Sequence, residues 1–161
     1  MLSYDLYSET NPAFISFLLY RFVESFNASA PANPHFSLCY LAVPISLSDR
    51  LQPSFSATNS STGLLAWASR FPEVRIGLGR EVVASRQMTT DGLRACLHCG
   101  LITIGAHGTL LKGAAKTPPA NARDKLPDNP KQVIRRAERL GKWMSTAGSA
   151  SLIFSALEVN L

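Results

Sequence analysis

The chain has 161 residues, of which 46% are hydrophobic and 17% charged, and its formal net charge at pH 7 is +5. This composition excludes disordered, collagen-like and coiled-coil proteins, and the length predicts a single domain over residues 1–161 with a sizeable buried core. The charge is uneven, because residues 1–111 hold 7 basic and 7 acidic residues whereas residues 112–161 hold 9 and 4. Such asymmetry favours attraction to acidic partners.

The first predicted element is a helix that starts at Asn11-Pro12 and runs to about Asn27. Asn caps free N–H groups at a helix start, and Pro in the first helical position loses no hydrogen bond. Apolar residues cover most of the circumference of this helix, so we expect it to be buried in the chain's own core or in that of a partner. Its candidate partner contacts are Phe14, Leu18 and Phe22.

Each of the next two segments contains a proline. Phe36 to Leu47 is apolar, and Pro44 is expected to kink or end a helix there. Leu51 to Thr62 is rich in Ser, Thr, Asn and Pro, which is typical of an exposed, mobile linker. This linker suggests a subdivision into an N-terminal helical segment (1–50), a central unit (62–112) and C-terminal helices (129–161).

The central unit is predicted to contain three helices followed by a hairpin. The helices are expected over residues 62–70, 73–86 and 90–99, with Thr89 or Thr90 capping the third. Two apolar runs, 101–104 and 109–112, flank a glycine-bounded turn, which is the pattern of a β-hairpin. The predicted fold class is therefore mostly α with a small β-hairpin, in which a winged-helix-like unit is flanked by N- and C-terminal helices.

Asn129-Pro130 predicts a second strong helix start, and this helix is expected to run to about Thr146 before a last short helix over 149–157. Its core stripe is expected to be Val133, Ala137, Leu140 and Met144. Another face carries a basic stripe that we treat as a candidate partner surface: Lys131, Arg135, Arg139 and Lys142, with Arg136 and Trp143 alongside. The candidates for its partner are an acidic protein surface and phosphates bound without sequence preference, and the alternative is a solvated charged face.

Potential metal ligands cluster at Cys96, His98 and Cys99. A structural zinc site needs four tetrahedral ligands, and on a helix Cys96 and Cys99 share a face while His98 points elsewhere. The spacing therefore favours small buried thiols, and we predict no metal. Because the chain has an odd number of cysteines and no predicted membrane span or secretory signal, we expect reduced thiols and a cytoplasmic location.

Nucleotide and catalytic motifs are not recognised in the sequence. Gly77 and Gly79 resemble part of a dinucleotide loop, but Val82 replaces the third glycine and no strand is predicted before them. The sequence has no Walker loop and no Gly-x-Ser-x-Gly elbow. We therefore expect no cofactor and no enzymatic activity. An enzyme with an unfamiliar site remains a weaker hypothesis, behind the two that are stated at the end of this section.

A winged-helix unit invites a DNA-binding interpretation, in which its third helix enters the major groove. That helix offers Arg94 and His98 against Asp91, and the tip of the hairpin offers His107. Groove-reading helices rely on Arg, Lys, Asn or Gln, so these residues disfavour sequence-specific DNA recognition.

Several short sequence segments are similar to those of a known protein family. They are Asn11-Pro12-Ala13-Phe14, Leu18-Leu19-Tyr20, Leu64-Leu65-Ala66-Trp67 before Phe71-Pro72, Leu97 to Ile102, Ala137 to Trp143, and Ala147-Gly148-Ser149. In this order they resemble the middle component of prokaryotic three-component ABC ATPase systems, which overlap with the Lamassu-type antiphage systems. The similarity extends from about Glu9 to Val159.

The resemblance implies a small accessory subunit that joins an SMC-like ABC ATPase to an effector subunit of a defence complex, and it carries over no catalytic residues. Our main hypothesis is thus a non-enzymatic adaptor in antiphage defence, with possible non-specific DNA contact through the complex. The alternative is a DNA-binding accessory or regulatory protein that uses the basic C-terminal helix.

Overall fold

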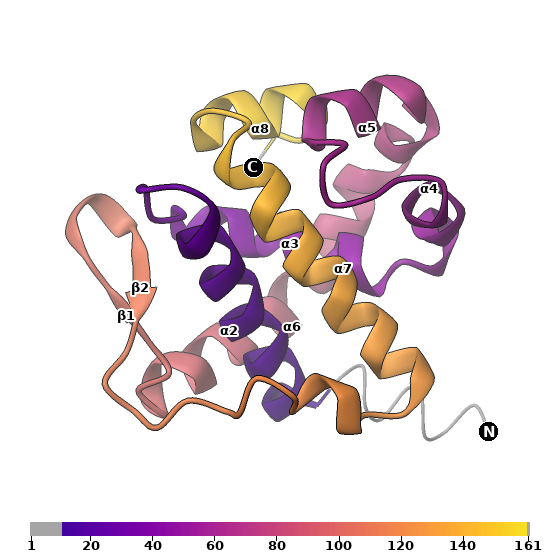
Figure 1. The fold of residues 1–161 in the computed structure, drawn as a ribbon. Helices are drawn as coiled ribbons and strands as arrows, with labels where there is room; N and C mark the ends of the chain where they lie inside the picture. Colours follow the sequence, from indigo (N-terminus) through magenta and orange to yellow (C-terminus); the bar gives the residue numbers. More distant parts are fainter. Residues whose placement is uncertain (1–10, 161) are drawn as a thin grey trace.

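The computed structural model describes residues 11–160. It is mostly helical, with one short antiparallel hairpin (Figure 1). The helices and strands are α2 (Pro12–Ser29), α3 (Cys39–Leu47), α4 (Gln52–Ser56), α5 (Leu64–Arg70), α6 (Leu78–His98), β1 (Ile102–Ile104), β2 (Leu110–Lys112), α7 (Asp128–Ser145) and α8 (Ala150–Ala156). Short 3-10 turns lie at η1 (Phe36–Leu38), η2 (Asp49–Leu51), η3 (Pro72–Arg75), η4 (Ala106–Gly108) and η5 (Arg123–Lys125).

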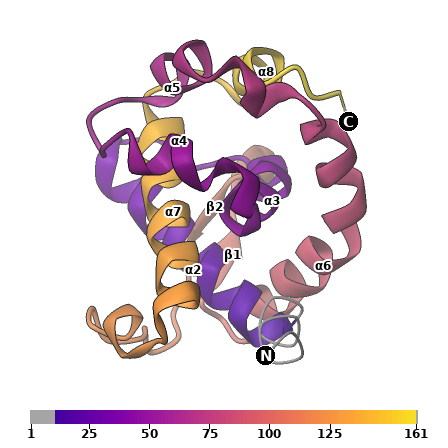
Figure 2. The ribbon, with the colours of Figure 1, turned by 90° about the vertical axis from the view of Figure 1, so that its right-hand side faces the viewer.

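Helix α2 is the central element, packed between α6 and α7 (Figure 2). Its predicted start is confirmed, because the Asn11 side chain accepts a hydrogen bond from the Ala13 N–H at 2.9 Å and Pro12 follows. Leu18 and Phe22 have no exposed surface. The apolar circumference of α2 is therefore covered by the chain's own core, and these two side chains do not reach the surface as the partner contacts that the sequence suggested.

Two glycines let α2 approach its neighbours closely. A Cβ atom on Gly92 of α6 would overlap the Ile15 side chain, and one on Gly141 of α7 would lie 2.5 Å from the Phe22 carbonyl oxygen. Both glycines lie in helix interiors, where they cost roughly 1 kcal/mol relative to Ala. The close packing on both sides of α2 offsets that cost.

Helix α6 is a single helix of 21 residues, so the prediction of two helices over 73–86 and 90–99 was wrong. The residues before Gly77 form η3, and Gly77 itself precedes the helix with a φ of +77°. Thr89 is fully buried within α6 and does not cap a new helix. Packing of this face against the core keeps the helix continuous through Thr89 and Thr90.

The segment from Leu51 to Thr62 is not a mobile linker, contrary to the sequence-based expectation. It contains α4, and Leu51 and Phe55 are 1% and 5% exposed. The Ser54 hydroxyl accepts a hydrogen bond from the Trp67 indole N–H at 2.9 Å and donates one to the Leu51 carbonyl at 2.6 Å. Leu51 and Phe55, four positions apart, thus anchor a segment whose composition is otherwise mostly polar.

The predicted hairpin is confirmed, with Thr103 paired with Leu111 across β1 and β2. Ile102 and Leu110 are buried, and the Leu110 N–H donates to the Pro34 carbonyl at 2.8 Å, which ties the hairpin to the segment before η1. The fold class is therefore mostly α with a small hairpin and flanking helices, as predicted. The comparison with a winged helix stays a prediction.

The remaining helices follow their sequence patterns. The predicted core stripe of α7 is confirmed, since all four of its residues are buried: Val133, Ala137, Leu140 and Met144. Ser149 caps α8 through the Leu152 N–H at 3.3 Å. Pro44 lies inside α3, which continues to Leu47, so this proline does not end the helix. Within residues 11–160, no helix combines the length and the apolar character that crossing a membrane requires.

Candidate functional site

The basic stripe of α7 divides into a buried part and an exposed part. Arg136 and Trp143 are only 5% and 1% exposed, whereas Arg135 and Lys142 are exposed. Lys131 is partly buried and lies 3.9 Å from an Asp128 carboxylate oxygen. The six candidate residues therefore do not form one flat surface. Phe14 of α2, the remaining candidate, is partly buried and packs against the core.

Arg139 is held in place by the segment that follows α4. Its Nη1 donates to the carbonyl oxygens of Phe55 at 2.6 Å and Thr58 at 3.1 Å. The guanidinium carbon lies 5.9 Å from the centre of the Phe55 ring and 5.8 Å from that of Trp143, which is within cation–π range. Burial lowers the pKa of Arg139, which still leaves an arginine charged at neutral pH.

Trp143 and Arg136 fasten α7 to earlier parts of the chain. The Trp143 indole N–H donates to the Asn59 carbonyl at 3.2 Å, and its ring stacks on Phe55 with a centroid distance of 5.7 Å. The Arg136 guanidinium donates to the Ser48 carbonyl at 3.0 Å. Both residues thus hold the fold together, which the sequence did not indicate.

A small hollow lies between α4 and α7. Its volume is about 180 Å³, and we call it the arginine cleft. It is lined by Gln52, Phe55, Ser56, Gln132, Arg135, Arg136 and Arg139. Three guanidinium groups with polar amides and a hydroxyl can bind an anion, because each guanidinium presents several N–H donors in a fixed plane.

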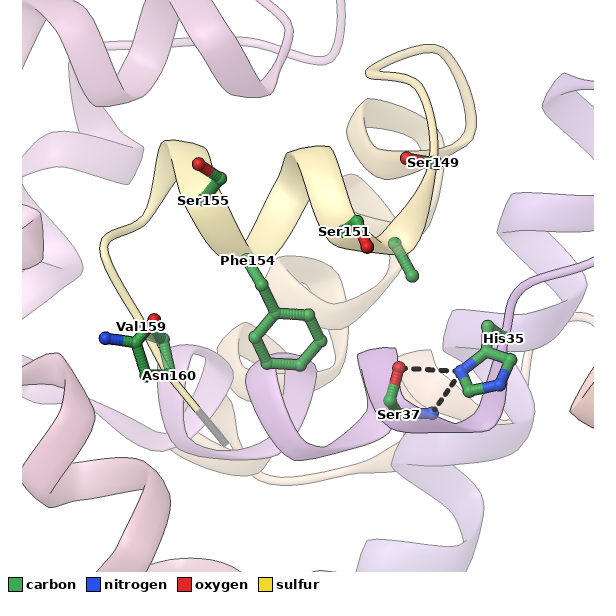
Figure 3. Close-up of a pocket in the computed structure, with 9 residues that line it drawn as sticks. His35, Ser37, Ser149, Ser151, Phe154, Ser155, Val159 and Asn160 are labelled. Carbon is green, nitrogen blue, oxygen red and sulfur yellow. Dashed lines mark hydrogen bonds between the residues drawn. The ribbon is translucent and has the colours of Figure 1, made fainter.

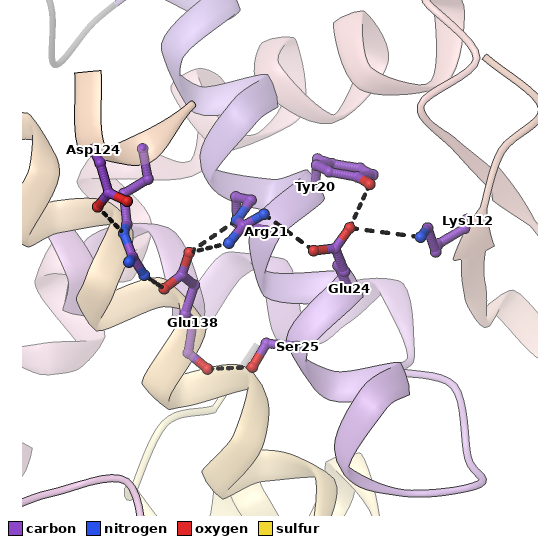
Figure 4. A network of polar contacts seen from close by, with 8 residues as sticks. Tyr20, Arg21, Glu24, Ser25, Lys112, Asp124 and Glu138 are labelled. Atoms are coloured by element: carbon purple, nitrogen blue, oxygen red, sulfur yellow. Dashed lines mark hydrogen bonds and ion pairs between the residues drawn. The ribbon is translucent and has the colours of Figure 1, made fainter. Parts of the chain in front are cut away.

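A second, shallower hollow of about 300 Å³ shares Arg135 and Arg139 with the arginine cleft. Lys142 and Arg123 also line it, together with Glu138, Ser25 and Ser60. The Glu138 carboxylate is already engaged, with one oxygen 2.7 Å from Arg21 Nη2 and the other 2.5 Å from Arg123 Nη1 (Figure 4). Glu138 therefore neutralises Arg21 and Arg123 more than it does Arg135 or Lys142.

The Glu138 contacts belong to a wider polar network that joins α2 to α7 and to the hairpin (Figure 4). Glu24 of α2 accepts from the Tyr20 hydroxyl and from Arg21 Nη1, and lies 3.6 Å from Lys112 Nζ of β2. Burial, followed by the hydrogen bond to Glu24, raises the pKa of Tyr20 to about 12. This network ties elements together, and its carboxylates are taken up by basic partners within the chain.

A third hollow, of about 680 Å³, lies between the η1 region and α8 (Figure 3). His35 Nδ1 accepts from the Ser37 N–H at 3.3 Å and lies 2.7 Å from the Ser37 hydroxyl, and serines of α8 line the other wall. No carboxylate is among the described lining residues that could orient the His35 ring as a base. No sequence pattern points to this hollow, because its walls come from opposite ends of the chain.

The cysteine cluster does not converge on one point. Cys96 is buried and its thiol lies 3.5 Å from the Ser16 carbonyl, while Cys99 and His98 are exposed. Burial raises the pKa of Cys96 to about 11 and that of Cys39 still further above its usual range. Among the described residues, no three His, Cys, Asp or Glu side chains are grouped closely enough to hold a metal ion.

The sequence also suggested Gly77 for nucleotide binding, and Arg94 and His107 for DNA binding. Gly77 follows a 3-10 turn and not a strand, which a dinucleotide loop would require. Arg94 is exposed at the end of α6 and lies 4.0 Å from Asp91, and His107 is exposed in the hairpin turn with a φ of +57°.

Comparison with known proteins supports the resemblance to the middle component of three-component ABC systems. Residues 4–161 match the family model described as ABC-three component (ABC-3C) system Middle Component 3. Searches of curated proteins and of solved structures found no match. Because the family model covers nearly the whole chain, this protein belongs to the Middle Component 3 family of ABC-three component systems.

Proposed function

We propose that this chain is a non-enzymatic adaptor that joins the ABC ATPase of its system, an SMC-like enzyme, to an effector subunit. The observation that carries the proposal is the family match over residues 4–161, because a middle component works with the other components of its system. In this proposal the complex works in the cytoplasm and takes part in Lamassu-type antiphage defence.

The distribution of charge supports a role in binding. Arg135 and Lys142 are exposed on α7, and neither forms an ion pair with any residue of the described part of the chain. The carboxylates of Glu24 and Glu138, by contrast, are engaged inside the molecule. Arg135 and Lys142 thus present positive charge on α7 that is not paired with a described carboxylate, which suits contact with an acidic partner.

Co-expression with the ATPase and effector components encoded in the same system tests this proposal. An affinity tag on this chain is expected to retain both components through size-exclusion chromatography, and deletion of its gene is expected to abolish protection against phage in a plaque assay. The purified chain alone is expected to hydrolyse no ATP. A chain that elutes alone despite expression of both components contradicts the adaptor role.

The second candidate is a DNA-binding accessory protein that uses α7. The exposed charges of Arg135 and Lys142, which have no ion-pair partner among the described residues, are the observation that favours it. In that case the isolated chain binds duplex DNA of any sequence, and the logarithm of its affinity falls linearly with the logarithm of salt concentration. Retention on immobilised DNA at several salt concentrations, measured without the other components, separates this candidate from the adaptor.

A further inference from the structure

The arginine cleft is positively charged without a carboxylate among the described residues of its wall. Its lining consists of three arginines, two glutamines, a serine and a phenylalanine. Arg139 donates to the neutral carbonyls of Phe55 and Thr58, so these bonds fix its position without cancelling its charge. Arg135 forms no ion pair with the described residues. An anion that enters the cleft therefore meets at least two uncompensated guanidinium groups.

Two of the three arginines of the cleft, Arg136 and Arg139, are held in place by hydrogen bonds within the chain. Arg139 lies against the Phe55 and Trp143 rings and is bound to two carbonyl groups through Nη1, which leaves its other nitrogens without a hydrogen bond among the described residues. A side chain that is already immobilised loses little conformational entropy when it binds, so more of the interaction energy remains as affinity. Planar guanidinium groups also match the geometry of a carboxylate.

The size of the cleft limits what it can hold. Its volume of about 180 Å³ is well below the roughly 300–1,000 Å³ of sites that enclose small-molecule ligands and cofactors. A nucleotide exceeds it, whereas one aspartate or glutamate side chain fits. The charges are also concentrated at one point, whereas tight sequence-independent DNA binding uses about 6–10 phosphate contacts along the backbone.

The chain already uses this chemistry elsewhere on α7. Glu138 inserts its carboxylate between Arg21 of α2 and Arg123 of η5, with contacts of 2.7 Å and 2.5 Å. The arginine cleft has the guanidinium half of such an arrangement. We propose that the arginine cleft receives an aspartate or glutamate side chain from an acidic segment of a partner component, an inference that rests on the proposed adaptor function.

Charge reversal at the rim of the cleft tests the inference in the assembled complex. Arg135→Glu is expected to weaken binding of the partner components by about tenfold or more, since truncating or reversing a desolvated charge pair is costly. Arg86→Glu on α6 is the matched control, because Arg86 is also exposed and lies outside the cleft. Affinity is measured by surface plasmon resonance with the immobilised partner components, and Arg86→Glu is expected to bind like the wild type.

A second variant fills the cleft with the chain's own carboxylate. Gln132 is exposed and lines the cleft, so Gln132→Glu keeps the size of the side chain and adds one negative charge beside the arginines. This variant is expected to keep or raise thermal stability, because the new carboxylate would lie four residues before Arg136 on the same helix face. It is also expected to weaken partner binding, by competing with the incoming carboxylate.

Protection of the wild-type protein provides a measurement that needs no variant. Phenylglyoxal modifies accessible arginines. It is expected to modify Arg135 in the free chain and to modify it at least about tenfold more slowly in the complex. Peptide mass spectrometry measures the extent of modification. Arg86 is expected to react equally in both states.

The outcomes separate the two proposals. If no complex forms with the wild-type chain, the adaptor function fails. If the complex forms but Arg135 stays reactive and Arg135→Glu binds normally, the adaptor function stands and the arginine cleft is not its contact. If a short DNA duplex protects Arg135 in the free chain while the assembled components do not, the cleft binds nucleic acid and the inference is overturned.

Discussion

Gly141 of α7 lies against the backbone of α2 at Phe22, and a Cβ atom at this glycine would be 2.5 Å from the Phe22 carbonyl oxygen. Backbone atoms inside a helix cannot rotate away from such a contact. Gly141→Ala is therefore expected to lower the free energy of unfolding by about 1–3 kcal/mol, through overpacking. Urea denaturation followed by tryptophan fluorescence measures this change.

Gly79→Ala is the control for that substitution. Gly79 also lies in a helix, α6, but a Cβ atom there meets nothing within 4 Å. Alanine has the higher helix propensity, so this variant is expected to be as stable as the wild type or more stable by up to about 1 kcal/mol. Equal losses in the two variants would show that the contact with Phe22 is not what makes Gly141 necessary.

Glu138 is expected to be the most sensitive member of the polar network. Glu138→Gln removes the charge that Arg21 and Arg123 share, and the Glu138 and Arg21 side chains are only 17% and 13% exposed. The expected loss is about 1–3 kcal/mol, less than for a fully buried pair because solvent still screens this one. Thermal unfolding followed by circular dichroism checks it.

The matched control is Asp124→Asn, which removes a carboxylate that also contacts Arg123. The Asp124 side chain is 51% exposed, and exposed pairs contribute about 0–1 kcal/mol. A loss at Asp124 as large as the loss at Glu138 would contradict the view that burial gives the Glu138 contacts their strength.

Tyr20 is expected to make the free energy of unfolding depend on pH in the alkaline range. Its pKa is raised from about 10 to about 12, so the folded state keeps the phenol proton at pH values where the unfolded chain has released it. This contribution to the free energy of unfolding is complete below about pH 10 and is lost as pH rises through about 12. The difference in stability between the wild type and Tyr20→Phe is therefore expected to fall over that window.

Ultraviolet titration of phenolate absorbance provides the direct check on Tyr20. The difference between the wild-type and Tyr20→Phe curves is expected to show one group that ionises near pH 12. Ionisation of that group near its ordinary pKa of 10.0 in the folded protein would rule out the environment described here.

The three cysteines are expected to differ sharply in reactivity. Cys39 and Cys96 are buried with raised pKa values, whereas Cys99 is exposed. Since the thiolate is the reacting form, one thiol is expected to react rapidly with Ellman's reagent in the native protein and all three in denaturant. Cys99→Ser is expected to abolish the rapid phase, and a rapid phase that survives would mean that α6 opens readily.

Elements with a strong local pattern could be predicted from the sequence. Asn11-Pro12 marks the start of α2, and the apolar residues of α7 recur at helical spacing, so the predictions of both helices are confirmed. The hairpin could also be predicted, because its glycine-bounded turn separates two apolar runs. In each case the residues within the element suffice to predict its secondary structure, without help from distant contacts.

Elements decided by distant contacts could not be predicted. Thr89 has the residue type of a cap, but burial against the core keeps it inside α6. The polar composition after Leu51 suggested a linker, yet Arg139 and Trp143 of α7, far along the chain, bind its carbonyl groups. The same contacts divide the basic stripe into structural and exposed residues, which a helical pattern alone does not distinguish.

The position of α2 has a consequence for how the protein is made. Residues 12–29 are synthesised about a hundred residues before α7, which covers one side of this helix and begins at residue 128. The side of α2 that packs against α7 thus stays uncovered in the nascent chain until residues 128–145 have been synthesised. Such long-range pairing slows folding and leaves apolar surface exposed, so we expect the nascent chain to bind chaperones at the ribosome.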